Sequence, residues 1–497
     1  MATFALAAPP AAVDQIARGR YLAAAGDCAA CHTAKDGTPY AGGLSMNTPF
    51  GPISTPNITP DKATGIGNWT DEQFYRAMHD GRGKRGEYLY PVMPFPWYTK
   101  VTRDDVMAIK AYLFSLAPVH QPRAPSKLSF PFDIRDSLAA WRALFFVPGE
   151  FVPDASQNEQ VNRGAYLVNG LAHCGECHDS RLLAGASRFQ KPLQGGAIDG
   201  WYAPNITSDV RDGIGGWSDA QLVQFLRTGA APGKGIAVGP MAETVHSLSQ
   251  LSDSDVEAVA AYLKSTPPAA SMGTSPAGLV GRGGDAYLNY CASCHGVDGK
   301  GVGGIAPRLA GNGAVLSKGP QNVIQVILGG LESRHGYGPM PAIGAAIDDE
   351  DIAEIANFVR QSWGNNAPPT AESGMVHEAR ARSDTLMNAA PLTSCPAVAQ
   401  PMVAQAIADR RHGISALLGA TNESNMPEQV ARIVSRTRAA APGASGTEVV
   451  NGLTAAYCKV VRADPDLDWN WKALQLGHFS QLVYAQISSG GLTKMRQ

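Results

Sequence analysis

The stretch CAACH at residues 28–32 decides the fold of this chain, because the same Cys-x-x-Cys-His pattern returns as CGECH at 174–178 and CASCH at 291–295. We call these runs the first, second and third motif. The sequence around them repeats as well, since residues 56–59 and 204–207 both read Pro-Asn-Ile-Thr. Repetition on this scale indicates duplicated domains, and a chain of 497 residues has room for three or four of them.

The motif itself indicates the cofactor. Cys-x-x-Cys-His is the attachment signature of c-type haem: the two thiols form thioether bonds to the porphyrin, and the adjacent histidine binds the iron. A redox dithiol would need a βαβ context and a zinc site would need a second cysteine pair nearby, and the sequence offers neither. We therefore expect three covalently bound haem c groups, held by Cys28, Cys31 and His32; Cys174, Cys177 and His178; and Cys291, Cys294 and His295.

The sixth iron ligand separates electron transfer from chemistry at the iron. A methionine there gives a closed centre of raised potential, which suits electron transfer. Met93 lies between prolines in Tyr90-Pro-Val-Met-Pro94, Met241 follows Gly239-Pro240, and Met340 stands in Gly338-Pro-Met-Pro341. We expect these three methionines to be the axial ligands, because a proline-restricted loop can hold a sulfur in place at little entropic cost.

Other residues could take these roles. Met46 is a weaker rival of Met93, whereas the helix-like spacing of Met78 and Met107 is typical of core residues. Four further histidines could replace a methionine but are expected to be ordinary surface or core residues: His79, His173, His246 and His335. A ligating histidine usually donates its other ring N–H to a carbonyl group. Three prolines downstream of the motifs could offer that carbonyl or could simply form turns: Pro56, Pro204 and Pro307.

Each copy closes on a predicted amphipathic helix that begins with acidic residues, at 104–113, 253–263 and 349–359. Proline-rich linkers follow each helix, and little strand alternation precedes it, so the fold class is mainly α with long loops. The predicted organisation is an export-signal remnant or N-terminal arm at 1–14, three haem-binding domains at 15–135, 136–272 and 273–368, and a small helical C-terminal domain at 369–497.

Composition excludes some classes of protein. With 41 basic and 43 acidic side chains, the chain lacks the basic surface that a nucleic-acid partner requires. No stretch of 18 apolar residues is present, so the sequence predicts no membrane-spanning helix. The apolar run at 138–147 is too short to span a bilayer; we expect a buried helix between domains, with an interfacial membrane anchor as the alternative.

The last 130 or so residues follow no repeat of the earlier domains. They contain the two remaining cysteines, Cys395 and Cys458, which in an exported protein suggest a disulfide. Free buried thiols are the alternative. Helical spacing at 427–438 and 474–487 predicts a small helical domain that docks on a partner or the membrane, or that acts as a stabilising lid.

The chain resembles the three-haem cytochrome c subunits of membrane-associated bacterial dehydrogenases of the alcohol, aldehyde and gluconate type. Besides the motifs, residues 15–368 share Tyr40-Ala-Gly-Gly43, Asn57-Ile-Thr-Pro60, the Met93 loop and Ser362-Trp-Gly-Asn-Asn366 with that family. The resemblance implies a class I cytochrome c-like fold for each of the three domains. It also implies a periplasmic location, peripherally attached to the outer face of the cytoplasmic membrane.

The resemblance further implies an electron-transfer role. A catalytic dehydrogenase subunit of flavin, quinone-cofactor or molybdenum type would oxidise its substrate, and the haems would pass the electrons to ubiquinone in the respiratory chain. We expect no substrate chemistry and no catalytic residue in this chain itself. The alternatives are a multihaem oxidoreductase with its own catalytic haem, favoured if an axial methionine is missing, and a free periplasmic electron carrier.

Overall fold

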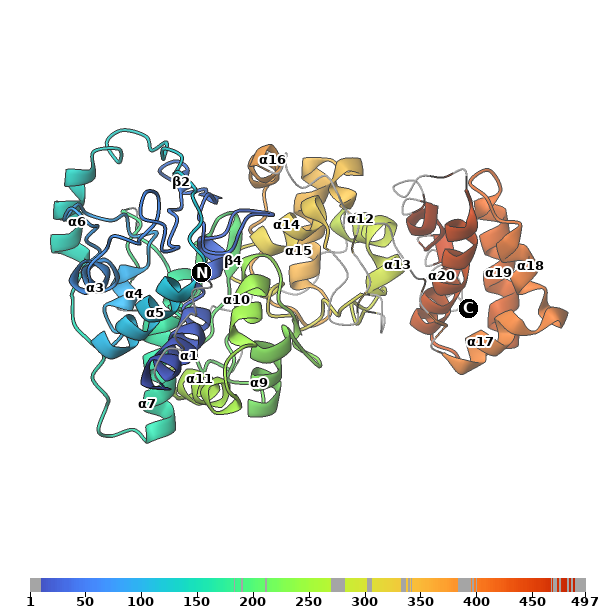
Figure 1. Cartoon of the computed structure of the whole chain (residues 1–497). Helices are drawn as coiled ribbons and strands as arrows, with labels where there is room; N and C mark the ends of the chain where they lie inside the picture. Colours follow the sequence, from blue (N-terminus) through green and yellow to red (C-terminus); the bar gives the residue numbers. More distant parts are fainter. Residues whose placement is uncertain are drawn as a thin grey trace, which may run out of the picture. The chain divides into compact units, whose positions relative to one another are not determined.

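The structure is a computed structural model that describes residues 10–487. Within this range it leaves out residues 183, 189–190, 211, 270–281, 302–305, 332–336, 338–339, 341, 383–394, 396, 399, 466, 468–471, 473–474, 481 and 484–485. This part of the chain is mainly helical, as expected (Figure 1). It also contains three short two-stranded sheets. The chain divides into two compact units. The first contains Met1–Asp199, Asn205–Ala231 and Ala237–Ser271, and the second contains Gly200–Pro204, Pro232–Ile236 and Met272–Gln497.

The first two motifs lie in similar successions of helices and short strands. The first succession is α1 (Pro10–Ala25), α2 (Cys28–Cys31), β1 (Ser45–Met46), β2 (Ile53–Ser54), α3 (Asp71–Asp80), α4 (Phe95–Tyr98), α5 (Arg103–Ser115), η1 (Arg135–Ser137) and α6 (Leu138–Phe145). The second is α7 (Glu159–Tyr166), the π-helical turn η2 (Leu167–Leu171), α8 (Gly175–His178), β3 (Gly196–Ile198), β4 (Trp201–Ala203), α9 (Asp219–Thr228), β5 (Ala230–Ala231), β6 (Gly235–Ile236), α10 (Pro240–Leu248) and α11 (Asp253–Ser265).

The helix before each motif packs against a later helix through a glycine. In α1 a Cβ added to Gly19 would lie 1.8 Å from the Ala108 oxygen of α5, and in α7 one on Gly164 would lie 1.9 Å from the Ala258 oxygen of α11. A side chain at either glycine would therefore force the two helix backbones apart. The sequence predicted α5 and α11 at 104–113 and 253–263, and both helices are present.

Side-chain caps set where these helices begin. The hydroxyl oxygen of Thr102 accepts a hydrogen bond from the Asp105 backbone N–H, and Ser252 does the same for Asp255. Capping boxes begin both α3 and α9, in which a Thr or Ser pairs with a Gln three residues later. Such caps satisfy N–H groups that the helix itself leaves unpaired, so the repeated sequence gives repeated helix starts.

The second unit holds the third motif and the C-terminal residues. Around the motif lie α12 (Arg282–Tyr290), α13 (Ala292–His295), α14 (Gln321–Gly329), η3 (Ile343–Ala346), α15 (Asp349–Gln361) and α16 (Ser373–Arg382). Helix α12 packs on α15 as α1 packs on α5, with a Cβ on Gly283 only 2.4 Å from the Glu354 oxygen. Helix α15 is the third predicted closing helix. The same glycine-mediated helix pair thus accompanies each of the three motifs.

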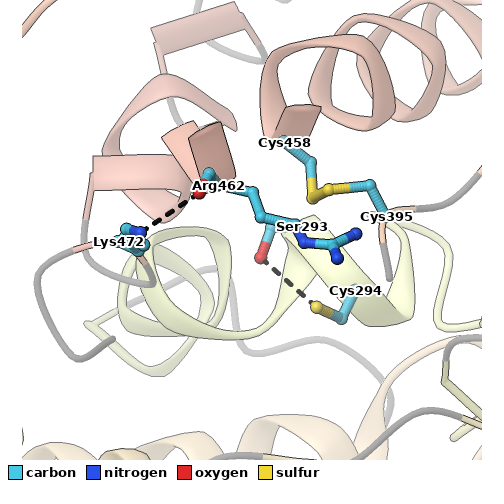
Figure 2. The surroundings of a disulfide bond; sticks show 6 residues. All are labelled: Ser293, Cys294, Cys395, Cys458, Arg462 and Lys472. Carbon is cyan, nitrogen blue, oxygen red and sulfur yellow. Dashed lines mark hydrogen bonds between the residues drawn. A yellow bond between two sulfur atoms is a disulfide. The ribbon is translucent and has the colours of Figure 1, made fainter. Parts of the chain in front are cut away.

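The C-terminal residues form further helices: α17 (Pro401–Ala408), η4 (Arg410–His412), α18 (Ile414–Gly419), α19 (Met426–Ala440) and α20 (Gly446–Ala463). The predicted helix at 427–438 is α19, whereas the one at 474–487 lies partly outside the described residues. A disulfide joins Cys395 to Cys458 across 63 positions, in agreement with the sequence expectation, and its surroundings include Ser293 and Cys294 of the third motif (Figure 2).

The expectation of a buried helix at 138–147 is wrong. Helix α6 does form there, but only Leu138 in it is buried, while Leu144 and Val147 are 74% and 79% exposed. The sequence could not indicate this, because an apolar run reports a tendency to leave water and not whether a partner surface is present. Among the described residues, no helix is both long and apolar enough to cross a membrane.

Candidate haem-binding sites

Each motif forms a single helical turn that brings its cysteines and histidine together. In the first motif, Asp27 adopts the left-handed conformation (φ 51°), and the His32 backbone N–H donates to the Cys28 oxygen at 3.0 Å. In the second and third motifs the histidine N–H bonds to the first cysteine in the same way, at 2.9 and 3.0 Å. A spacing of two residues between the cysteines thus places both thiols and the imidazole on one helical turn.

A backbone carbonyl orients the motif histidine in two of the sites. His32 Nδ1 lies 2.8 Å from the Pro56 oxygen, and His295 Nδ1 lies 3.0 Å from the Pro307 oxygen. A carbonyl can only accept, so Nδ1 carries the proton and the lone pair on Nε2 is free to bind a metal. Both prolines were candidates for this role, with a simple turn as the alternative; Pro204 stays a candidate for His178.

A glycine also holds each motif histidine through its backbone, and the sequence did not reveal these glycines. Gly42, Gly195 and Gly301 donate their N–H groups to the carbonyl oxygens of His32, His178 and His295, at 2.7, 2.7 and 2.8 Å. All three have positive φ, at 75°, 91° and 73°. They stand 10, 17 and 6 residues after their histidines, so no fixed sequence spacing identifies them. The positive φ angles and the hydrogen bonds in the structure do identify them.

Two of these glycines also hold the carbonyl that orients the imidazole. A Cβ on Gly42 would lie 2.4 Å from the Pro56 carbonyl carbon, and one on Gly301 would lie 2.6 Å from that of Pro307. No side chain fits between the glycine and the proline loop. The glycine therefore fixes the backbone on both sides of the histidine, whereas the sequence indicated only the proline.

The chemical state of the motif residues fits haem c. Burial raises the pKa of the thiols to about 12 at Cys28, Cys31, Cys174, Cys177 and Cys291, and none of the six motif cysteines forms a disulfide. A zinc site or a reactive dithiol needs thiolates, which such surroundings disfavour. Burial also lowers the pKa of His32 and His295, and these histidines are therefore neutral. Neutral thiols beside a neutral imidazole whose Nε2 can bind a metal fit the two thioether bonds and the iron ligand of a protein that binds c-type haem.

The three predicted axial methionines lie in the same apolar cores as their motifs. Met93 and Met241 pack against the core that Cys28 and Cys174 also contact. Met340 packs against the core of the third motif and pairs with Leu331 through two backbone hydrogen bonds of 2.8 Å. The flanking residues Gly338, Pro339 and Pro341 lie outside the described residues. Ligation of iron by these methionines stays a prediction that their placement supports.

The rival residues have other contacts. Met78 is 5% exposed and belongs to the core, as its spacing indicated, and Met46 lies in β1. His79 Nδ1 bonds to Asp80 at 2.7 Å, and its ring stacks on Tyr75. His335 lies outside the described residues. The burial of Met78 and the contacts of His79 favour Met93 over these two rivals.

Two protein-family models match the chain. The model described as cytochrome c matches residues 16–117, which contain the first motif. The model described as cytochrome c oxidase, cbb3-type, subunit III matches residues 278–359, which contain the third. Cytochrome c domains therefore surround at least two of the motifs.

Relatives extend the comparison over most of the chain. The gluconate 2-dehydrogenase cytochrome c subunit of Pantoea cypripedii is 39% identical over 411 residues, which cover 76% of this chain and 92% of the relative. The fructose dehydrogenase cytochrome subunit of Gluconobacter japonicus is 40% identical, over 74% of this chain and 82% of the relative. A nicotinate dehydrogenase subunit of Pseudomonas putida is 39% identical over 71% of this chain, but this chain spans only 30% of that protein. The chain belongs to the family of cytochrome c subunits of dehydrogenases.

Proposed function

We propose that this chain binds three haem c groups in three tandem cytochrome c domains, at 15–135, 136–272 and 273–368, and works as the electron-transfer subunit of a dehydrogenase complex. The observation that supports it most is the threefold recurrence of one local arrangement. At every motif a glycine N–H holds the histidine carbonyl, and a glycine-mediated helix pair closes the fold around it. Bound haem supplies a reversible one-electron iron couple, which the protein tunes through its ligands and their surroundings.

The partner is a catalytic dehydrogenase subunit. The names of three relatives specify gluconate, fructose and alcohol as the compounds oxidised by their complexes, and these share a CH–OH donor group, whereas the name of a fourth specifies nicotinate. We extend that donor class to the complex of this chain, with ubiquinone as electron acceptor and the periplasmic face of the cytoplasmic membrane as the location. In such a complex the residues of this chain bind and orient haem, and the catalytic subunit performs the substrate chemistry.

An exposed apolar segment supplies the surface for membrane contact. Six large apolar side chains between residues 130 and 152 are at least 40% exposed: Phe130, Phe132, Ile134, Leu144, Val147 and Val152. An isolated exposed apolar residue is ordinary, whereas six of them in one short segment favour an interaction site there. Aromatic and aliphatic side chains of this kind enter the interfacial region of a bilayer without spanning it.

The membrane proposal is tested by sedimentation of the holo-protein with vesicles of bacterial lipid. Substitution of Leu144 and Val147 by Glu should reduce the bound fraction, because two charges would then have to enter the interface. Val210→Glu is the matched control, since Val210 is 73% exposed but lies outside the segment. Equal binding of all variants would rule out this segment as the contact.

The electron-transfer proposal is tested by native purification from membranes. We expect a large dehydrogenase subunit to accompany the chain, and three haem c groups per chain by pyridine haemochrome assay and intact mass. Adding the substrate of that dehydrogenase should reduce low-spin haem. Recovery of the chain alone would favour a free carrier, and a high-spin haem that binds small ligands would favour an oxidoreductase acting at its own haem.

A further inference from the structure

We call each motif together with the two helices that cross beside it a repeat. The helices of the first two repeats are joined by a reciprocal set of hydrogen bonds. In α1, Arg18 pairs with Asp105 of α5 at 2.5 Å, and in α7, Arg163 pairs with Asp255 of α11 at 2.7 Å. These pairs lie at equivalent positions, because each arginine directly precedes the glycine at which its helices cross. Each pair connects two helices that accompany the same motif.

A tyrosine three residues after each arginine crosses to the other motif's helices. The Tyr21 hydroxyl donates to Asp255 Oδ2 at 2.6 Å, and the Tyr166 hydroxyl donates to Asp105 Oδ2 at 2.5 Å. Each aspartate therefore accepts hydrogen bonds from an arginine of its own repeat and from a tyrosine of the other repeat. This reciprocity is the pattern of a twofold interface between two similar partners, formed here within one chain.

The third repeat has the arginine but lacks the tyrosine. Arg282 precedes the crossing glycine of α12 and pairs with Asp351 of α15 at 2.6 Å, as in the other two repeats. The residue three positions later is Asp285, and it is exposed. A carboxylate at this position cannot donate to a second carboxylate and would repel it. The bonding pattern that joins the first two repeats is therefore unavailable to the third.

Helix α4, which follows Met93, and helix α10, which contains Met241, make a second set of contacts between the two repeats, close to the motifs. From α4, Trp97 Nε1 donates to Oε2 of Glu176, the residue between the cysteines of the second motif, at 2.9 Å. A Cβ on Gly175 of that motif would lie 2.3 Å from the Trp97 ring. In the reverse direction, the Ser247 hydroxyl of α10 donates to Asp27, which directly precedes the first motif. Helix α4 thus contacts the second motif, and helix α10 contacts the residue before the first motif.

We propose that Tyr21 and Tyr166, by binding the aspartates of the opposite repeat, position the first two motifs so that their haems form one interacting pair. The third repeat lacks the tyrosine, so the same bonds do not add its haem to this pair. The inference rests on the proposed binding of haem at these motifs. Because thioether bonds tie each haem to its motif, contacts that fix the relative position of the motifs also fix that of the haems. The tyrosines are positioning residues and take no part in electron transfer themselves.

The test uses full-length holo-protein with both tyrosines replaced, as Tyr21→Phe with Tyr166→Phe and as Tyr21→Asp with Tyr166→Asp, the latter copying the third repeat. Tyr262→Phe is the matched control, because its hydroxyl accepts from Asn169 within the second repeat alone. Haem content is measured first, and a wild-type protein that contains no haem would contradict the proposed function itself. The readouts are the bisignate Soret circular dichroism of interacting haems and a potentiometric titration of the same samples.

We expect the wild-type protein and Tyr262→Phe to share one Soret couplet and a titration that requires two interacting haems. The double Phe variant should show a weaker couplet, and the double Asp variant should lose it and titrate as independent centres while retaining its haems. If the double variants fail to fold, Tyr21→Phe alone is measured in the same way. A couplet and titration unchanged by loss of the tyrosines, or absent from the wild-type protein, would overturn the proposal.

Discussion

Replacing Gly19 by Ala should destabilise the first unit, because the added Cβ has no space. It would lie 1.8 Å from the Ala108 oxygen and 2.9 Å from the Tyr112 Cβ. A carbon–oxygen contact needs about 3.3 Å, so α1 and α5 would have to separate by roughly 1.5 Å. The nearer group is backbone and cannot rotate away, which leaves movement of a whole helix as the only relief.

The magnitude follows from two opposing effects. Overpacking of this kind costs about 3 kcal/mol at the upper end of its usual range. Alanine also forms helix better than glycine by about 1 kcal/mol, which offsets part of that cost. The net loss is about 2 kcal/mol, which for a unit of this size lowers the melting temperature by about 4–8 °C.

The assay is thermal unfolding of the holo-protein followed by far-ultraviolet circular dichroism, with Soret absorbance recorded to confirm haem content. Gly170→Ala is the control in the same unit, because the nearest heavy atoms to its Cβ lie 3.7 Å away, an ordinary contact distance. We expect that variant to melt close to the wild-type protein. If Gly19→Ala has the same melting temperature as Gly170→Ala, the helices do not cross as closely as described. The reasoning for the equivalent Gly164 and Gly283 then also fails.

Three further predictions concern other parts of the chain. Met340→Ala should open the sixth position of the third haem, giving a high-spin, carbon monoxide-binding spectrum; a spectrum that stays low-spin would assign another ligand. Replacing Cys458 by Ser should destabilise the C-terminal helices by about 4 kcal/mol, because the disulfide closes a loop spanning 63 positions, with haem content unchanged; limited proteolysis of those helices measures this, and unaltered resistance would contradict it. Burial and the hydrogen bonds to Asp255 and Asp105 raise the pKa of Tyr21 and Tyr166, so their contribution is present below about pH 10 and is lost as pH rises through the folded pKa values. Above about pH 10, the melting temperature should therefore fall less steeply with pH in Tyr21→Phe/Tyr166→Phe than in the wild-type protein. Equal slopes would count against the two hydrogen bonds.

Much of the site was predictable from sequence because the features involved are local. Three residues of each motif stand within five positions, and one helical turn brings them together whatever surrounds it. The closing helices were equally visible, since an acidic start and apolar spacing indicate both the beginning of a helix and its buried face. The disulfide followed from a count of cysteines in which only one pair lay outside the motifs.

Features that depend on a distant partner were missed or misjudged. Gly42, Gly195 and Gly301 hold the motif histidines from different spacings, so no fixed pattern pointed to them. The helix at 138–147 was expected to be buried, yet its apolar side chains are largely exposed. In both cases the sequence specified the residue type, and the surroundings supplied by folding specified its role.

The amino-acid sequence was enough to identify three Cys-x-x-Cys-His motifs, to predict which residues attach haem, and to predict the helices that close around each motif. Covalent chemistry and helical periodicity act over a few neighbouring residues, which is why these features can be read locally. The packing of the folded chain was needed to show that hydrogen bonds join the first two repeats and that Asp285 of the third repeat stands where they have the joining tyrosine. Tyr21 and Asp255 lie 234 positions apart, and their hydrogen bond exists only because two helix pairs pack against each other. Hydrogen bonds between residues so distant along the chain depend on how whole repeats pack, and a local sequence pattern does not encode that packing.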